Sequence, residues 1–388
     1  MPSRRRRTAG SVRRLPSGRW QARIRDPRTN LLESLGSYDT KGDADRAVAM
    51  ATTDGLRGQW ARPALGRRRL AEWVDEWWAT TTNLAPSTRV RDESVILHHI
   101  LPAFGTFALA DIGQLDVRSW VADLVASGLA PTTVHKAYQV LSKAMAAAVD
   151  AGMLALSPCR SVPLPKVEPS EMRFLSPDEI ARLAVTIAPR YRALVLVGGY
   201  GGLRIGELAG LRRSRVDVLR ARLEVAEKIV EVRGELLTGG PKTRAGRRQV
   251  PLPRPVADEL AVHLERFVAP EPDALLFAGP DGGALRARAW RARHWAPAVA
   301  EAGLAPLRPH DLRHTAVALW IAREASPKQI ATWAGHTSVS VVLDRYGHLF
   351  PGHEEAVMRR LEEGYAMPTV PVPADVRTLP TAATRPHQ

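Results

Sequence analysis

Residues 335–349, GHTSVSVVLDRYGHL, place Tyr346 ten residues after His336, near the C-terminal end of a strongly basic chain. One tyrosine among six is more often a core aromatic than a nucleophile, so its surroundings must decide between the two. Three other stretches of the same region also look unlike simple packing. They are GGLRIGELAGL at 201–211, PKTRAG at 241–246 and RPHDLRHTA at 308–316.

Each of these stretches carries side chains suited to binding an anion. Arg204 follows two glycines among apolar residues and therefore needs an anionic partner; Glu207, three residues on, is a candidate. Lys242 lies in a basic turn, where its ammonium group can reach outward. His310 and Arg313, spaced i and i+3, are expected on one face of a helix.

A metal site is not expected. His310 and His314 have the i, i+4 spacing of a metal pair, but no third ligand occurs at the spacing of zinc enzymes. The sequence also lacks the clustered carboxylates that would hold Mg²⁺. Cys159 is the single cysteine, which excludes a cysteine-based zinc cluster and an intramolecular disulfide. We therefore expect neither a metal nor another cofactor.

Together, these side chains suit the transfer of a phosphoryl group. Two arginines can clamp the non-bridging oxygens of a phosphodiester through bidentate hydrogen bonds, and two histidines can add further hydrogen bonds. A lysine can protonate the departing 5′ oxygen. A tyrosine hydroxyl can attack phosphorus if neighbouring cations stabilise the phenolate that develops. Because these cations neutralise the transition state directly, the reaction does not require a metal.

The composition favours a multidomain protein that binds nucleic acid. The chain has 388 residues, too many for one ordinary domain, and 45% are apolar, enough for globular cores. Its net charge of +15 predicts a polyanionic partner. No apolar run approaches the roughly 18–20 residues of a membrane span, and no apolar segment of a secretory signal follows MPSRRRR. We expect a cytoplasmic protein without a membrane partner.

Residues 1–60 are the most basic part of the chain, with thirteen Lys or Arg against six Asp or Glu. Short strand patterns followed by a helical pattern predict a small sheet with one helix. Arg19, Arg23 and Arg25 alternate along one strand and would project from one face, and a ribbon of this width fits a DNA major groove. A solvated basic tail that folds only on contact is the alternative.

Residues 67–156 show helical patterns joined by short connections, which predict a compact bundle. Its second helix is expected to begin with Ser87 as the N-cap. Gly128 and Gly152 are expected to end its last two helices.

The rest of the chain predicts a linker, a second large domain and a tail. Residues 157–171 are proline-rich and predict the linker. Residues 172–365 predict a domain in which helices surround β-rich segments on both sides of the basic turn, and Ser176 is expected to cap its first helix. Residues 366–388 predict a disordered tail. The fold class expected is mainly α with small β-sheets, including an α+β catalytic domain.

Four motifs in this last large domain, LRIGEL, PKTRAGRRQVPL, HDLRH and GHTSVSVVLDRYGHL, resemble in this order the tyrosine recombinase family, specifically the phage-type site-specific integrases. The resemblance covers residues 172–362 and extends more loosely to the two N-terminal regions. Ala325 stands where a glycine is more usual, and AGH replaces the commoner LGH. Neither difference touches a reacting group.

The resemblance implies catalytic roles for the side chains singled out above. Arg204 and Arg313 would clamp the scissile phosphate, Lys242 would be the general acid, and Tyr346 would be the nucleophile. Two histidines, the first of the HxxR motif and the second near the scissile phosphate, complete the set. They are His310 and His336.

The same resemblance implies an enzyme that exchanges DNA strands through a covalent 3′-phosphotyrosyl link, to integrate or excise a phage or another mobile element. Residues 1–60 would bind arm-type sites, and the bundle with the catalytic domain would bind core-type sites. Arg244 and Arg247 of the basic turn are further candidates to contact DNA. The implied assembly is a homotetramer on double-stranded DNA in a bacterial host, with residues 354–363 docked on a neighbouring subunit. A host DNA-bending protein and an excision factor are further candidate partners.

Three other functions compete with this interpretation. A type IB topoisomerase shares the tyrosine chemistry but acts as a monomer and reseals the same strand. A resolvase of the chromosome-dimer type typically lacks such an N-terminal domain. A DNA-binding regulator without chemistry would be favoured if a catalytic position were missing, but all six are present. The basic N-terminal domain and the bundle favour the integrase.

Overall fold

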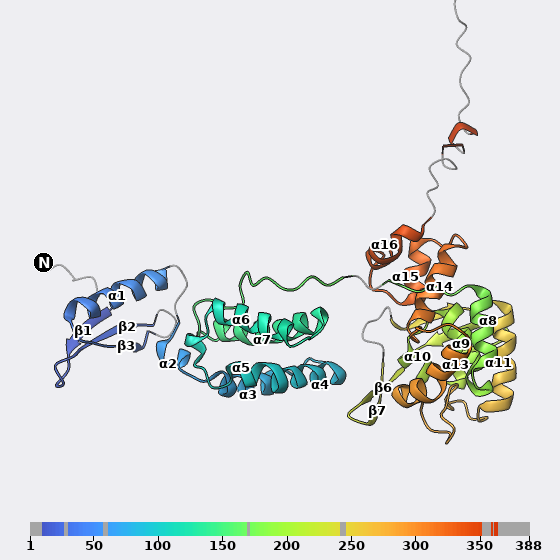
Figure 1. Ribbon diagram of the computed structural model, residues 1–388, viewed down its shortest axis with the longest axis horizontal. Coiled ribbons are helices and arrows are strands. Elements are labelled where there is room, and N and C mark those ends of the chain that lie inside the picture. Colours follow the sequence, from blue (N-terminus) through green and yellow to red (C-terminus); the bar gives the residue numbers. More distant parts are fainter. Residues whose placement is uncertain are drawn as a thin grey trace, which may run out of the picture. The chain divides into compact units, whose positions relative to one another are not determined.

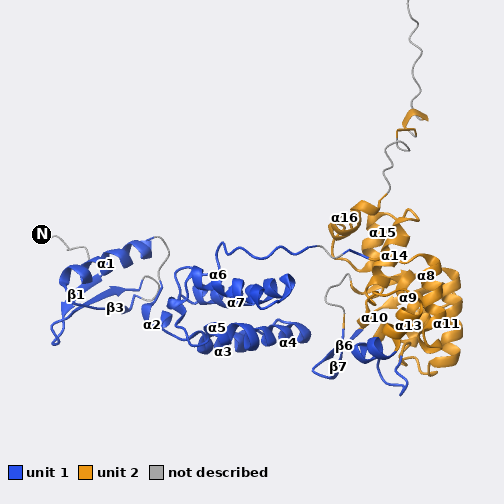
Figure 2. Ribbon diagram, in the orientation of Figure 1, with its two compact units in different colours: residues 1–172, 228–239, 278–293 blue, residues 173–227, 240–277, 294–388 orange. Residues whose placement is uncertain are grey.

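The structure is a computed structural model that describes residues 10–26, 30–56, 61–168, 171–240, 246–350, 358–359 and 361–363. Its chain divides into two units, drawn in different colours in Figure 2. The first comprises residues 1–172, 228–239 and 278–293, and the second comprises 173–227, 240–277 and 294–388.

The N-terminal part of the first unit is a three-stranded antiparallel sheet with one helix, as predicted (Figure 1). Its elements are β1 (Gly10–Arg14), β2 (Trp20–Arg25), β3 (Leu32–Tyr38) and α1 (Lys41–Leu56). Ala22 and Ile24 alternate along β2 and are buried, and Ile24 packs with Ala51 of α1. The alternation places Arg23 and Arg25 on the opposite face of this strand.

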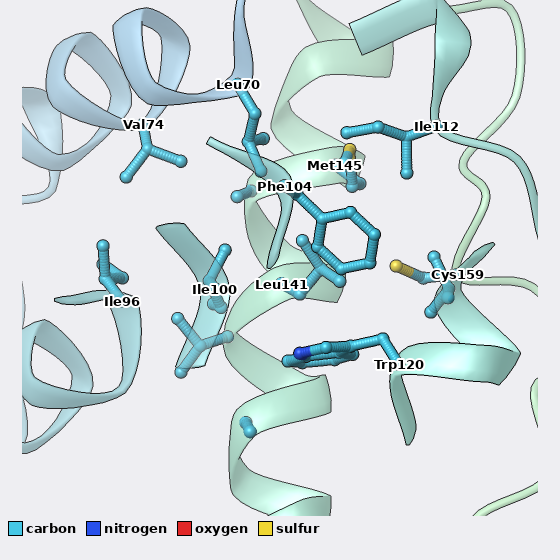
Figure 3. Packing of buried hydrophobic residues seen from close by; sticks show 14 of the residues in the cluster. Leu70, Val74, Ile96, Ile100, Phe104, Ile112, Trp120, Leu141, Met145 and Cys159 are labelled. Atoms are coloured by element: carbon cyan, nitrogen blue, oxygen red, sulfur yellow. The ribbon is translucent and has the colours of Figure 1, made fainter. Parts of the chain in front are cut away.

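A helical bundle follows in the same unit. Its helices are α2 (Pro63–Gly66), α3 (Leu70–Thr80), α4 (Pro86–Val95), α5 (Leu101–Phe104), α6 (Gln114–Ala126) and α7 (Pro131–Asp150), with a π-helical turn at Ile96–Ile100. Large apolar side chains fill the core (Figure 3). Phe104 meets Trp120 edge-on with ring centroids 5.6 Å apart, and Trp73 Nε1 donates to the Ala144 carbonyl at 2.9 Å. The buried indole N–H is thus satisfied.

The bundle corrects one expected helix start and confirms two helix ends. Ser87 is not the N-cap of α4, because Ala85 takes this position and Pro86 occupies the first turn. Proline suits the first turn because its φ is fixed near the helical value and its missing N–H would have no partner there. Gly128 and Gly152 follow α6 and α7 with φ of 82° and 74°, the left-handed conformation typical of helix ends.

Part of the predicted linker packs on the bundle. Cys159 and Val162 are buried in the bundle core, and the Tyr138 hydroxyl donates to the Cys159 carbonyl. His135 Nε2 lies 2.8 Å from the Pro165 carbonyl oxygen. Burial raises the pKa of the Cys159 thiol to about 11, so this cysteine is a protonated core residue at neutral pH.

The first unit also contains a two-stranded hairpin, β6 (Lys228–Val232) and β7 (Glu235–Gly239), and a short helix, α12 (Ala287–Trp290). Gly234 forms the hairpin turn with φ of 83°. Arg286 donates to the Gly234 carbonyl at 2.7 Å and thereby ties the segment before α12 to this turn.

The second unit surrounds a small sheet with helices. Its helices are α8 (Pro177–Thr186), α9 (Pro189–Gly201), α10 (Ile205–Ala209), α11 (Arg254–Phe267), α13 (Ala296–Glu301), α14 (Asp311–Ile321), α15 (Pro327–Ala334) and α16 (Ser340–Tyr346). The strands β4 (Val216–Asp217), β5 (Arg222–Val225) and β8 (Arg248–Pro251) pair antiparallel in this order. Helix α9 packs against α8, α11 and α14. The predicted cap of α8 is confirmed, since Ser176 Oγ accepts from the Glu179 N–H at 3.1 Å.

The basic turn lies between β7 and β8, which belong to different sheets. Residues 241–245, and with them Lys242 and Arg244, lie outside the described residues, as does the predicted tail 366–388. In the part of the chain that the structure describes, no helix is long and apolar enough to cross a membrane.

Candidate active site

The turn between α9 and α10 presents Arg204. Gly202 has φ of 65°, and a Cβ there would lie 2.8 Å from the Trp320 ring, so this position requires glycine. Arg204 comes directly before α10; its N–H donates to Glu207 Oε2 at 2.9 Å and its Nη1 to Oε1 at 3.0 Å. The predicted pairing with Glu207 is therefore confirmed. The Arg204 side chain is not buried, however, because 44% of its surface is exposed and free to meet a ligand.

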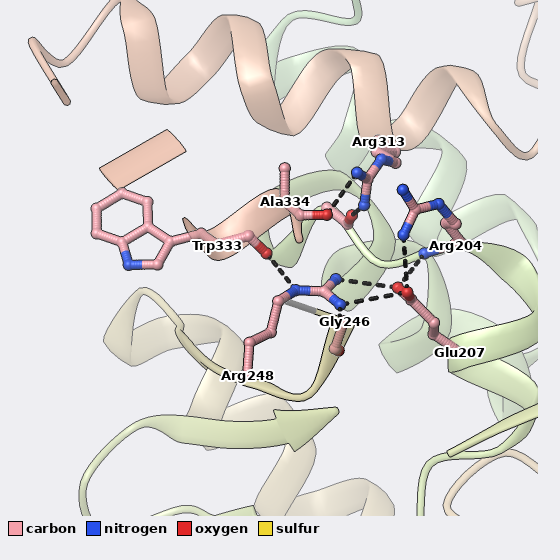
Figure 4. A network of polar contacts seen from close by, with 8 residues as sticks. Arg204, Glu207, Gly246, Arg248, Arg313, Trp333 and Ala334 are labelled. Carbon is pink, nitrogen blue, oxygen red and sulfur yellow. Dashed lines mark hydrogen bonds and ion pairs between the residues drawn. The ribbon is translucent and has the colours of Figure 1, made fainter. Parts of the chain in front are cut away.

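Glu207 is a buried carboxylate held between two arginines (Figure 4). Besides Arg204, it accepts from Arg248 Nη1 at 3.2 Å and Nη2 at 3.0 Å. Burial alone would raise the pKa of Glu207. The hydrogen bonds and charges of Arg248 and Arg204 outweigh burial and hold the pKa at about 2. Glu207 is thus ionised throughout the physiological range.

Arg313 lies in the first turns of α14 and is 2% exposed. It donates to the Gly202 carbonyl at 2.8 Å and to the Ala334 carbonyl, and so joins the turn after α9 to the end of α15 (Figure 4). Burial, and next the charge of Arg204, lowers the pKa of Arg313 to about 9. The guanidinium remains charged at neutral pH.

The two predicted histidines lie within the field of these arginines. His310 lies at the start of α14, where the residue is exposed but its ring meets the ring of His314 edge-on with centroids 4.8 Å apart, and His336 follows α15. Burial, and next the charges of Arg313 and Arg204, lowers the pKa of His336 to about 4 and also lowers the pKa of His310. Both rings are therefore largely neutral at neutral pH, a state in which one ring nitrogen donates and the other accepts.

Tyr346 ends α16 and is 1% exposed. Its hydroxyl lies 2.6 Å from Nδ1 of His314, a buried residue of α14. Burial raises the pKa of Tyr346, although the charges of Arg313, Arg345 and Arg204 oppose this rise. The hydroxyl is thus protonated at neutral pH, yet its phenolate would form among positive charges.

The structure therefore brings five of the six predicted catalytic residues into one electrostatic environment. They are Arg204, His310, Arg313, His336 and Tyr346. The sixth, Lys242, lies outside the described residues. Among the residues described, no group of three metal-ligating side chains is present. The cluster suits an anion with several oxygens, such as a phosphodiester.

The predicted DNA-binding arginines belong to both units. Arg23 and Arg25 lie in β2, whereas Arg19 precedes this strand and pairs with Asp39 at 3.2 Å. Arg247 is exposed beside β8, with its Nε 3.6 Å from a Glu224 carboxylate oxygen. Arg244, like Lys242, lies outside the described part of the chain.

Two residues of the site were missed by the sequence reasoning. His314 was considered only as a metal ligand, and its contact with Tyr346 spans 32 residues. Arg248 was not singled out, although a signal existed. It shares the buried face of its strand with Val250, two residues on, and an arginine at such a position must have partners.

Replacing Glu207 with glutamine is expected to destabilise the second unit. The amide has no charge and offers one acceptor oxygen where Arg204 and Arg248 now share two, so the free energy of unfolding should fall by about 3 kcal/mol. Because folding lowers the pKa of Glu207, its ionised carboxylate stabilises the folded state fully above the ordinary carboxyl pKa. This stabilisation is lost as the pH falls towards 2. In urea denaturation, the difference in the free energy of unfolding between wild type and Glu207→Gln should stay constant from neutral pH to about pH 5 and shrink below it.

The matched control for this prediction is Glu224→Gln. Glu224 accepts from Arg215 at 2.6 Å, but 31% of its side chain is exposed, so its loss should cost less than about 1 kcal/mol. Equal losses for the two variants would contradict a special role for the buried carboxylate.

Three family models match this chain. The model for the phage integrase family matches residues 173–353. Models for the phage integrase N-terminal domain and for the phage integrase N-terminal SAM-like domain match residues 8–56 and 69–125.

The chain is also similar to known integrases. It is 27% identical over 379 residues to the prophage phiRv2 integrase of Mycobacterium tuberculosis (strain ATCC 25618 / H37Rv), which covers 94% of this chain and 98% of that protein. The Tn1549 transposon integrase in complex with a circular intermediate DNA has a TM-score of 0.65 at 18% identity, covering 76% and 99% of the two chains. A lambda integrase tetramer bound to a Holliday junction has a TM-score of 0.54 at 18% identity, covering 90% and 97%. The structural likenesses show a shared fold.

Proposed function

We propose that this chain, which belongs to the phage integrase family of tyrosine recombinases and is a site-specific DNA recombinase, attacks the scissile phosphate with the hydroxyl of Tyr346. One observation carries the assignment of the nucleophile. The charges of Arg313 and Arg204 both act on the Tyr346 hydroxyl. The same two arginines can therefore stabilise the phenolate and bind the phosphate that it attacks.

The proposed reaction is a transesterification. A bond forms between the Tyr346 oxygen and phosphorus, and the bond from phosphorus to the 5′ oxygen breaks. The products are a 3′-phosphotyrosyl link and a free 5′ hydroxyl. Because the covalent link keeps the energy of the phosphodiester, the 5′ hydroxyl of a second strand can reverse the attack without ATP.

Arg204 and Arg313 divide the binding of the phosphate in this proposal. Arg204 is half-exposed, and the N–H groups that do not bind Glu207 can donate to two oxygens of the phosphate. Arg313 is buried against two carbonyls and supplies a fixed positive charge behind the phosphate. His310 and His336, neutral at neutral pH, would each donate one hydrogen bond to a non-bridging oxygen.

Two proton transfers accompany the exchange. His314 Nδ1, 2.6 Å from the hydroxyl and part of a ring whose pKa burial and His310 lower to about 4, is a neutral acceptor for the proton of Tyr346. Lys242 would protonate the departing 5′ oxygen. This second role rests on the sequence, where Lys242 occupies the basic turn between β7 and β8.

Recognition of DNA is proposed to be divided among the domains. Residues 1–60 would bind arm-type sites, with Arg19, Arg23 and Arg25 facing the DNA. Residues 67–156 and the catalytic domain, 172–365, would bind core-type sites, with Arg244 and Arg247 contacting the backbone. The net charge of +15 supports extensive contact with phosphates, so affinity should fall steeply with salt.

We propose that the active form is a homotetramer on two double-stranded DNA sites, acting in the cytoplasm of a bacterial host. The shared fold with a lambda integrase that forms a tetramer on a Holliday junction supports this assembly. Residues 354–363 would dock on a neighbouring subunit. A host DNA-bending protein and an excision factor are candidate partners for the choice between integration and excision.

The proposal is tested by trapping the covalent intermediate. The protein is expressed in a bacterial host that carries the DNA flanking its gene, and the cells are lysed in denaturant. The DNA joined to the protein is sequenced, and mass spectrometry of the nuclease-treated protein identifies the tyrosine that carries a nucleotide. We expect adducts at one defined site, a 3′ linkage, and the modification on Tyr346.

Other outcomes would redirect the assignment. Adducts scattered without a defined site would favour a topoisomerase, and a modification on another of the six tyrosines would remove Tyr346 as the nucleophile. DNA binding without any adduct, even after addition of host extract, would contradict the proposed chemistry.

A further inference from the structure

Arg248 is a buried arginine in the middle of the site. Only 3% of its side chain is exposed, because β8 turns Arg248 and Val250 inward, whereas Arg247 and Gln249 point outward. A guanidinium in such a place is tolerated when its N–H groups all find acceptors. The identity of these acceptors indicates what the residue does.

On one side, Arg248 binds the carboxylate of Glu207, which also binds Arg204. Its Nη1 and Nη2 donate to the two oxygens of Glu207 at 3.2 and 3.0 Å, a bidentate pair. The same two oxygens accept from the backbone N–H and Nη1 of Arg204. Arg248 therefore fixes the plane of the carboxylate, and the carboxylate in turn fixes the direction of the Arg204 guanidinium (Figure 4).

On the other side, Arg248 braces the turn that precedes His336. Its Nε donates to the Trp333 carbonyl at 2.6 Å, and its Nη1 also donates to the Gly246 carbonyl at 3.1 Å. Gly335 has φ of 64°, and a Cβ there would lie 2.9 Å from Nη1 of Arg248. The chain therefore passes directly over the guanidinium and continues into His336.

These bonds occupy most of the guanidinium N–H groups of Arg248, so it is poorly suited to bind DNA itself. We propose that Arg248 is a positioning residue of the recombination reaction: it orients Arg204 through Glu207, and His336 through the turn from Trp333 to Gly335. This inference rests on the proposed function, since it assigns Arg248 to the reaction of Tyr346.

The test compares DNA cleavage by wild type and Arg248→Lys. The probe is a duplex that contains the site found in the adduct experiment, with a nick near it that traps the cleaved state. Lysine keeps the charge but cannot span both oxygens of Glu207 and the Trp333 carbonyl. We expect covalent cleavage to slow by about 100-fold at saturating DNA, as for a small misplacement of reacting groups. The affinity for the duplex should change little, because Arg248 is buried.

A double-mutant cycle separates positioning from a general loss of structure. If Arg248 acts in part through Arg204, the double variant Arg248→Lys/Arg204→Lys should be slowed by clearly less than the product of the two single effects, because the loss through Arg204 is already taken and only the part that acts through His336 remains. The control is Arg215→Lys, which weakens an ion pair with Glu224 outside this network. It should leave cleavage unchanged, and combining it with Arg204→Lys should give the product of the two single effects.

The outcomes are distinguishable. Wild-type cleavage by Arg248→Lys, or multiplicative effects of Arg248→Lys and Arg204→Lys, would overturn the positioning role while leaving the proposed function intact. An equal fall in affinity and in cleavage would identify Arg248 as a DNA contact instead. If the wild type formed no adduct, the proposed function and this inference would both fall. Should Arg248→Lys unfold, Glu207→Asp shortens the same bridge, and its failure to slow cleavage at saturating DNA would overturn the proposal.

Discussion

Tyr346→Phe should form no covalent adduct with DNA, while it folds and binds the duplex. The variant lacks the oxygen that we propose attacks phosphorus, so the proposed transesterification would have no nucleophile. The phenyl ring keeps the buried packing of Tyr346 at the end of α16. Affinity for DNA, which depends mainly on phosphate contacts, should stay within about two-fold of wild type.

Tyr346→Phe should also lower stability slightly. The substitution leaves Nδ1 of His314 without its partner at 2.6 Å in a buried place, which should cost about 1 kcal/mol in the free energy of unfolding. Adducts are counted after denaturing gel electrophoresis, and stability is followed by urea denaturation. The control is Tyr200→Phe, a half-buried tyrosine of α9 outside the cluster, which should cleave like wild type. Adducts with Tyr346→Phe at any appreciable rate would mean that another side chain is the nucleophile.

Local patterns allowed much of the fold and part of the site to be predicted. The cap of α8 and the pair of Arg204 with Glu207 join residues three apart, so both follow from the geometry of a single helical turn. The strands of the N-terminal sheet follow from the alternation along β2. The start of α4 was misplaced by a similarly local argument, because Ser87 and Pro86 are both favoured at a helix start and the proline took the first turn.

Contacts between distant segments were beyond such patterns. Arg248 reaches Glu207 across 41 residues and the Trp333 carbonyl across 85, and His314 reaches Tyr346 across 32. Which side chains meet at these separations depends on how α14, α15 and β8 pack, and no local periodicity encodes this. Similarly, β8 pairs with β5 and not with β7, which precedes it in the chain. The gathering of Arg204, Arg313 and Tyr346 was therefore predictable, whereas the contacts that support them were not.

Arg313→Lys should have the second large effect, a loss of about 10³-fold in the rate of covalent cleavage, as expected for an arginine that stabilises a phosphoryl transition state. An ammonium group is a single point of charge and cannot serve both the Gly202 and Ala334 carbonyls while facing a phosphate. Burial also disfavours the charged form of a lysine more readily than that of an arginine. The variant should therefore lose both position and charge at the point where the phenolate of Tyr346 is proposed to develop.

The control for Arg313→Lys is Arg182→Lys, because Arg182 also donates to a backbone carbonyl, that of Ala302 at 2.9 Å, but outside the cluster. It should cleave like wild type. If Arg313 acts through its charge at the phosphate, raising the pH towards 9 should slow cleavage by Arg313→Lys further relative to wild type. The buried lysine of the variant loses its proton over this range. The wild-type guanidinium, with a pKa of about 9, stays largely charged below that value. The measurement is the single-turnover cleavage rate of wild type and of Arg313→Lys across this pH range. A ratio of the two cleavage rates that stays constant with pH would mean that Arg313 acts chiefly by holding the turns at Gly202 and Ala334 together.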